Sequence, residues 1–186
     1  MTERTPEGGI ELSSAEIDAL DARWSSSWTP SEVARRLAGV AAPWCVAAGW
    51  ALELFRGTRT REHGDIEIAI PAATYQTWLR DPRSGDYLLD VFREPHDGEA
   101  WICRHDDTIR LPYSEIIQRT SDGIPYLAPE LVLLFKAKHV RPKDQSDFDE
   151  TIPYLSRTQL TALAGFLARP YPRHHWLDRL DRLDPR

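Results

Sequence analysis

One short stretch of the chain, residues 65–70, constrains the fold most strongly. It alternates between acidic or small residues and isoleucine, in the order Asp-Ile-Glu-Ile-Ala-Ile. Successive side chains on a β-strand point to opposite faces. The stretch therefore predicts a strand that buries its three isoleucines on one face and places Asp65 and Glu67 together on the other. Two neighbouring carboxylates repel each other, so positive charge is expected near them.

The rest of the chain predicts helices, then a strand-rich middle, then a helical last third. A capping box at Thr29–Glu32, with proline at the first helical position, marks one helix start. In the first part, helices are expected over 13–24, 29–40, from Gly49 onward, and over 71–79. Strands are expected over 44–47, 86–92, 101–104, 109–111 and 115–119. Further helices are expected over 129–140, 143–155, 158–168 and 174–183. This order predicts an α+β or α/β domain with a helical C-terminal part. The expected boundaries are a flexible tail at 1–12, an α/β core at 13–127 and a C-terminal helical region at 128–186 packed on the core.

Composition narrows the function classes. The chain has 186 residues and a formal net charge of −6, so duplex nucleic acid is not an expected partner. Its two cysteines are far apart in sequence, as in a reduced cytoplasmic protein. The N-terminal segment has no apolar core of a signal peptide, and no apolar run approaches the ~20 residues of a membrane span. A soluble cytoplasmic protein is expected.

Two features suit a phosphate group. Gly49 lies at a strand-to-helix turn, where backbone N–H groups can approach a phosphate closely. The following loop carries Arg56, Arg59, Arg61 and His63, and arginine side chains match phosphate oxygens. Either feature has a plain alternative, a tight turn in one case and a solvated loop in the other.

A third acid completes a candidate metal site. Asp90 shares a strand face with Leu88 and Phe92, and its strand is expected beside that of Asp65. Three hard oxygen donors on adjacent strands would hold magnesium. One alternative is an edge strand that exposes acids to solvent.

A second alternative is an iron site of the non-haem oxygenase type. His63 and Asp65 would supply two of its ligands, and a distant histidine would supply the third, from among His96, His105 and His139.

The stretch from Trp44 to Ile70 resembles the nucleotidyltransferase superfamily of the DNA polymerase β type. Within it, the chain is similar to the aminoglycoside-2''-adenylyltransferase and lincosamide nucleotidyltransferase group. The matching residues are the turn Ala48-Gly49-Trp50-Ala51, the loop positions Gly57, Thr60, Arg61 and His63, the acids Asp65 and Glu67, a later acid Asp90, and the stretch Lys136-Ala137, Arg141-Pro142-Lys143-Asp144 and Asp147-Phe148. Two residues depart from the group's pattern: Ala48 replaces the first glycine of a usual pair, and Glu67 is one methylene longer than aspartate.

The resemblance implies a fold, a reaction and a set of residue roles. The fold would be α+β, a mixed β-sheet nucleotidyltransferase core flanked by helices. The reaction would transfer a nucleoside monophosphate, AMP favoured, from ATP or another nucleoside triphosphate to a hydroxyl of a small acceptor, with two Mg²⁺ ions. The implied catalytic and metal-binding residues are Asp65, Glu67 and Asp90; the implied nucleotide-binding residues are Gly49, Trp50, Thr60, Arg61, His63, Lys136, Arg141 and Lys143.

The acceptor is less well defined by the sequence. An acidic protein suits a cationic acceptor such as an aminoglycoside antibiotic, and an acidic cleft is one reading of Glu94, Asp97, Glu99, Asp106 and Asp107; solvated loops are the other. A non-catalytic nucleotide-binding relative, acting as an antitoxin or regulatory partner, is the alternative function, and Ala48 favours it.

Overall fold

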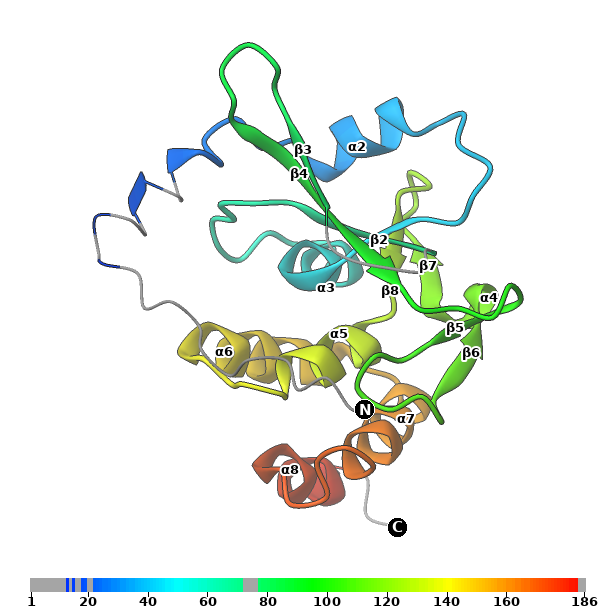
Figure 1. Cartoon of the computed structure of the whole chain (residues 1–186). Helices are drawn as coiled ribbons and strands as arrows, with labels where there is room; N and C mark the ends of the chain where they lie inside the picture. Colours follow the sequence, from blue (N-terminus) through cyan, green and yellow to red (C-terminus); the bar gives the residue numbers. More distant parts are fainter. Residues whose placement is uncertain (1–12, 14, 16–17, 20–21, 72–76, 184–186) are drawn as a thin grey trace, which may run out of the picture.

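A six-stranded mixed sheet forms the centre of the computed structural model, which describes residues 13, 15, 18–19, 22–71 and 77–183 (Figure 1). The strand order is β3-β4-β2-β1-β8-β7. The bounds are β1 Cys45–Val46, β2 Glu67–Pro71, β3 Thr77–Arg80, β4 Tyr87–Glu94, β7 Ile117–Arg119 and β8 Pro125–Leu127. The pairs β2–β4 and β1–β8 are parallel, and the pairs β1–β2, β3–β4 and β7–β8 are antiparallel. A separate hairpin pairs β5 (Ala100–Ile102) with β6 (Arg110–Pro112).

Helices lie on both faces of the sheet (Figure 1). Helix α2 (Pro30–Arg36) lies on one face; α3 (Ala48–Arg56), α5 (Pro129–Lys136) and α6 (Pro142–Thr151) lie on the other. The short α4 (Tyr113–Ile116) precedes β7, and a 3₁₀ turn, η1 (Ile152–Tyr154), follows α6. Helices α7 (Arg157–Ala168) and α8 (His175–Leu183) extend this second layer away from the sheet.

The predicted alternation is confirmed for Ile66 and Ile68, although β2 begins only at Glu67 and Ile70 is half-buried. Ile66 and Ile68 are buried in a small core with Val33 of α2 and Leu89 of β4. The other face of β2 therefore points toward α3 and α5, where a larger core contains Leu52, Leu133 and Phe148 among others. The α+β class and the helical C-terminal part are confirmed as well.

Several sequence predictions of local structure need correction. The helix expected over 71–79 is wrong: Pro71 ends β2 and residues 77–79 belong to β3, while 72–76 lie outside the described residues. Threonine, tryptophan and leucine suit a strand that has a partner, and here β4 supplies one. The strand expected over 115–119 begins only at Ile117, since residues 113–116 form the single turn α4. Part of the helix expected over 13–24 lies among residues that the structure does not describe.

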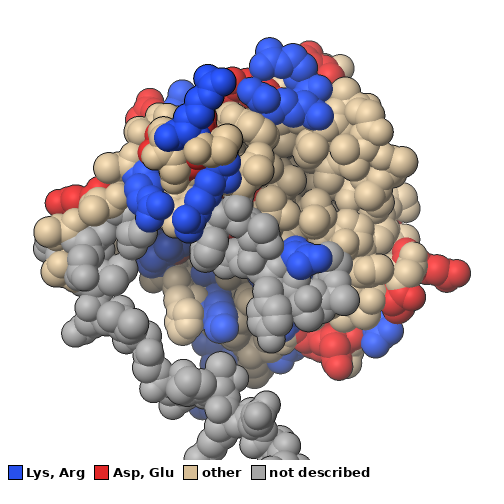
Figure 2. Space-filling view, turned by 45° about the horizontal axis from the view of Figure 1, so that its top comes forward, with Lys and Arg blue, Asp and Glu red and all other residues tan. Residues whose placement is uncertain are grey.

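Two further observations concern the helices and the surface. No helix in the described part of the chain is long and apolar enough to cross a membrane. On the face shown in Figure 2, Lys and Arg side chains gather mainly toward the upper left, uncharged residues cover much of the right, and acidic side chains lie toward the edges.

Helix α3 begins in an unusual backbone conformation. Ala48 has a φ of 48°, in the left-handed region that favours glycine. This is the position where the resembling group has its first glycine. The departure at Ala48 is thus accommodated by a strained backbone.

We predict that Ala48→Gly stabilises the protein by ~1 kcal/mol, because glycine adopts a positive φ without the Cβ clash. The matched control is Ala51→Gly, the same substitution one turn further along α3 at a buried position. It should destabilise by about 1 kcal/mol, because glycine is a poor residue in a helix interior. Chemical denaturation measures both; a loss of stability in Ala48→Gly would contradict the strain.

Candidate functional site

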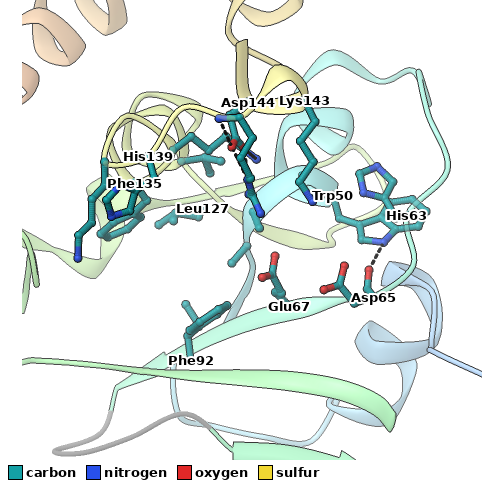
Figure 3. Close-up of a pocket in the computed structure, with 18 of the residues that line it drawn as sticks. Trp50, His63, Asp65, Glu67, Phe92, Leu127, Phe135, His139, Lys143 and Asp144 are labelled. Carbon is teal, nitrogen blue, oxygen red and sulfur yellow. Dashed lines mark hydrogen bonds and ion pairs between the residues drawn. The ribbon is translucent and has the colours of Figure 1, made fainter. Parts of the chain in front are cut away.

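A cavity of about 480 Å³ opens between the sheet and the helices α3, α5 and α6. Most of the sequence-predicted site residues line it: Gly49, Trp50, Arg61, His63, Asp65, Glu67, Lys136, Arg141 and Lys143. Thr60 and Asp90 are not among the described residues that line it. The cavity has one wall of backbone and ring groups, an acidic floor on the sheet, and a basic wall on the helices (Figure 3).

The first turn of α3 forms one wall. Residues 47–50 line the cavity, no acidic residue lies in the first turn, and no side chain caps this helix end in the described part of the chain. Its backbone N–H groups carry partial positive charge, as a phosphate-binding helix end requires. Arg61 and His63 pack directly over Gly49, where a Cβ atom would overlap Arg61 Nη2 and lie 2.7 Å from His63 Cε1. Glycine is therefore favoured at position 49, because any larger residue would push Arg61 and His63 out of these positions.

The loop after α3 is held by Glu53, a residue that the sequence interpretation missed. Its buried carboxylate Oε1 accepts hydrogen bonds from the backbone N–H groups of Thr60, at 2.9 Å, and Arg61, at 3.2 Å. The same oxygen lies 3.0 Å from His63 Nε2. Burial lowers the pKa of His63, although the bond to Glu53 opposes this. Through its backbone N–H bond to Glu53, Thr60 anchors the loop to α3.

Only part of the basic loop faces the cavity. Arg61 and His63 line it, and the His63 ring stacks on Trp50 with 4.5 Å between centroids. Arg56 instead pairs with Glu150 of α6 at 3.0 Å and donates to Thr60 Oγ1 at 2.8 Å. Arg59 pairs with Glu62 at 2.6 Å on the surface. Arg59 is half exposed and does not line the cavity, but its guanidinium carbon lies 5.2 Å from the centroid of Trp50. Arg56 is a structural bridge.

The acidic floor comes from two adjacent parallel strands. Asp65 lies just before β2 and Glu67 begins it; Asp90 of β4 is the register partner of Glu67. The expected neighbourhood of the two strands is thereby confirmed. Burial, followed by the negative charges of Asp65 and Asp90, raises the pKa of Glu67 to about 7, while Lys136 and Lys143 act in the opposite direction. Asp90 lies beside Glu67 and is buried, 5% exposed.

The donor chemistry of the floor fits a magnesium ion in part. Among the described residues, no group of three or more His, Cys, Asp or Glu side chains is already arranged to hold a metal. Asp65 and Glu67 nevertheless offer hard oxygen donors to the cavity, and their repulsion is what a divalent cation would relieve. Magnesium commonly takes one or two protein carboxylates and completes its shell with waters and substrate phosphates.

The basic wall is organised by two buried aspartates of α6, Asp144 and Asp147. Lys136 Nζ lies 3.0 Å from Asp144 Oδ1 and 2.8 Å from Asp147 Oδ2. Arg61 Nε lies 3.4 Å from Asp147 Oδ1, and Arg141 Nε lies 2.7 Å from Asp144 Oδ2. Burial would raise the pKa of Asp144, but hydrogen bonds from Arg141 and Lys136 outweigh it and hold this pKa well below its usual range. The aspartates thus fix the directions of three cations around the cavity.

Lys143 completes this wall. Figure 3 shows its side chain extending from α6 toward the floor with Asp65 and Glu67. The positive charge expected near the acid pair is therefore supplied by Lys136 of α5 and Lys143 of α6, across the cavity.

Two alternatives from the sequence do not agree with this arrangement. The iron-oxygenase alternative requires a double-stranded β-barrel with His63 as a ligand, whereas the fold is α+β and His63 Nε2 is directed to Glu53. Of the five acids considered for an acidic cleft, only Glu94 lines the cavity. Asp97 and Asp106 accept hydrogen bonds within their own exposed turns, so the solvated-loop reading applies to them.

We predict that Gly49→Ala destabilises the protein by about 1–3 kcal/mol, because the new methyl group displaces Arg61 and His63. Gly165→Ala is the control: Gly165 is an exposed position of α7, and a methyl group added there would have nothing within 4 Å. There alanine should stabilise by ~0.5–1 kcal/mol. Urea unfolding distinguishes the two, and equal effects would contradict the close packing over Gly49.

A second prediction concerns pH. The pKa of Glu67 rises from 4.5 to about 7 on folding, so the folded state holds the proton more tightly. Stability from this group is present below pH 4.5 and is lost as the pH rises through 7. In metal-free buffer, Glu67→Gln should therefore raise the melting temperature at pH 8, and this gain should vanish near pH 4.5. The exposed control Glu99→Gln should show no such pH dependence; a pH-independent effect of Glu67→Gln would contradict the shift.

Comparisons with known proteins add the following. No protein-family model and no curated protein matches the chain. Solved structures match with a probability of 1.00. A lincomycin-bound lincosamide antibiotic adenylyltransferase, LnuA, has a TM-score of 0.49 and 16% identity over 67% of this chain and 95% of its own. ANT(2'')-Ia in complex with adenylyl-2''-tobramycin has a TM-score of 0.48 and 17% identity over 75% and 94%. The solution structure of the antibiotic-resistance factor ANT(2'')-Ia has a TM-score of 0.49 and 14% identity over 91% and 98%. Each of these is a structure to which the chain is similar, at 14–17% identity.

Proposed function

We propose that the protein is a nucleotidyltransferase that transfers a nucleoside monophosphate, AMP favoured, from a magnesium-bound nucleoside triphosphate to a hydroxyl of a small acceptor. The observation that carries the proposal is a single cavity in which an uncapped helix end and a basic wall face two carboxylates. A triphosphate is strongly anionic, and the metals bound to it are cationic. Such a ligand matches both sides of the cavity at once.

In this proposal the first turn of α3 and the basic side chains hold the triphosphate. The N–H groups near Gly49 and Trp50, with Arg61, Lys136, Arg141 and Lys143, would bind phosphate oxygens. His63 contributes by packing on Trp50 and Gly49, which fixes the helix end. Thr60 contributes only by anchoring the loop.

Asp65 and Glu67 would hold two Mg²⁺ ions, with Asp90 beside Glu67 as the third carboxylate. Bound magnesium would supply charge neutralisation at the phosphates. The acceptor oxygen would form a bond to the α-phosphorus, the bond to the bridging oxygen would break, and pyrophosphate would leave. The proton of the acceptor hydroxyl would pass to a carboxylate, and the candidate is Asp90, the buried strand neighbour of Glu67. Positioning and charge would provide most of the rate.

The test of the reaction is a pyrophosphate-release assay. The protein is incubated with each nucleoside triphosphate, Mg²⁺ and a panel of aminoglycosides, lincosamides and smaller amino alcohols. Release with ATP and at least one acceptor is expected. The absence of release with every combination, from a protein that binds Mg·ATP, would favour a non-catalytic nucleotide-binding protein over the proposed enzyme.

The test of the site uses matched acid variants. Mg·ATP should raise the melting temperature, because a ligand that binds only the folded state stabilises it, and ATP with a chelator should do much less. Asp65→Asn should abolish the metal-dependent part and lower turnover by ~10²–10⁴-fold, without loss of stability in the ligand-free protein. Asp107→Asn, at an exposed position outside the cavity, is the control and should behave as the wild type. Equal shifts with and without metal would exclude the metal site.

A further inference from the structure

The end of the cavity away from the acid pair contains an arginine held between two aromatic rings. The Arg104 guanidinium carbon lies 5.0 Å from the centroid of Phe92 and 4.5 Å from that of Phe135. Its Nη1 lies 3.5 Å from Glu94 Oε1. All four residues line the cavity. Figure 3 shows Phe92 and Phe135 at the opposite end from Trp50, His63 and Asp65.

Glu94 is only half satisfied by this arrangement. Its side chain is 5% exposed, and burial raises its pKa, although Arg104 and the Trp101 side chain oppose this. Its Oε2 atom is buried without a geometrically defined hydrogen-bond partner among the described residues. A buried carboxylate oxygen without a partner is costly. The ion pair with Arg104 is long, and the Arg104 side chain is 38% exposed. The site therefore has capacity for a better-fitting cation.

The two rings and the carboxylate are more firmly placed than the arginine. Phe135 makes edge contacts with Trp101, at 6.0 Å between centroids, and with His105, at 5.0 Å. Phe92 and Glu94 belong to β4, in the sheet. Arg104 lies in the turn after β5, outside a helix or strand. A cation between aromatic faces is attracted by their quadrupoles, and this geometry recognises alkylammonium and guanidinium groups.

We propose that Glu94, Phe92 and Phe135 form a cation subsite for the acceptor, and that Arg104 occupies it as an internal substitute until the acceptor displaces it. The word acceptor rests on the proposed function; the cation subsite does not. The subsite takes one compact alkylammonium or guanidinium group. Lys138 and His139 line the same cavity, so a dense polycation is disfavoured there. The acceptor class is therefore a small hydroxylated molecule with a single cationic group at this end.

In the test, Arg104→Ala removes the competing side chain from the full chain. The variant and the wild type are each titrated with methylguanidinium and tetramethylammonium at millimolar concentration, without nucleotide or metal. Thermal shift and calorimetry measure binding. The variant should bind the probes roughly tenfold more tightly than the wild type, because the competing guanidinium is gone. The matched control is Arg110→Ala, which removes a 3.3 Å ion pair with Asp97 on the exposed surface, away from the cavity. It should show no gain.

Two outcomes would overturn the subsite. The first is an equal gain in Arg110→Ala, or no gain in Arg104→Ala. The second is retention of the gain in Arg104→Ala/Glu94→Gln, because the carboxylate would then play no part. If Arg104→Ala fails to fold, Arg104→Gln replaces it, with the same expectations. A protein that does not bind Mg·ATP, but whose Arg104→Ala variant gains probe binding, would exclude the proposed function and retain the subsite. The two failures are therefore distinguishable.

Discussion

The buried carboxylate of Glu53 is the contact on which the arrangement of the cavity depends. One oxygen receives two backbone N–H groups of the loop and faces the imidazole of His63. These contacts bring Arg61 and His63 onto Gly49, where an added Cβ atom would displace them. The start of α3 and Arg61 thereby come to lie together on one wall of the cavity. A carboxylate without these partners would be an isolated buried charge, so the loop and Glu53 stabilise each other.

Charge is separated across the cavity by secondary structure. The sheet supplies the acids, on neighbouring parallel strands, and α5, α6 and the segment that joins them supply most of the basic residues, Lys136, Lys138, Arg141 and Lys143. Each side is unfavourable by itself. Asp65 and Asp90 destabilise the ionised form of Glu67, and the three cations are held by ion pairs with Asp144 and Asp147. This is the balance expected of a site that gives up stability in the free protein and regains it when an anionic ligand and its metal bind.

The two ends of the cavity differ in the kind of group they suit. One end offers backbone N–H groups and arginine, which suit phosphate. The other offers two aromatic rings and a buried carboxylate, which suit an organic cation. Figure 3 shows Glu67 on the floor between Phe92 and Asp65, so two ligands bound at the two ends would meet near Glu67.

The sequence by itself determined the features that follow from local geometry. The alternation of residues 65–70 specifies which face of β2 is buried, because the side-chain period of a strand is fixed by its backbone. Glycine at the strand-to-helix turn and the capping box of α2 were predictable because each depends on residues close together in the sequence. The motifs alone assigned Asp65, Glu67 and Asp90 to neighbouring strands. The tertiary structure decided what depends on residues distant in the chain. Residues 77–79 form a strand because β4 pairs with them; Glu53 matters because a loop folds back on it; and Arg104 meets Phe92 and Phe135 only because the turn after β5, β4 and α5 converge. Such contacts carry no periodic signal, since nothing in the spacing of these residues along the chain specifies which distant partner each one packs against.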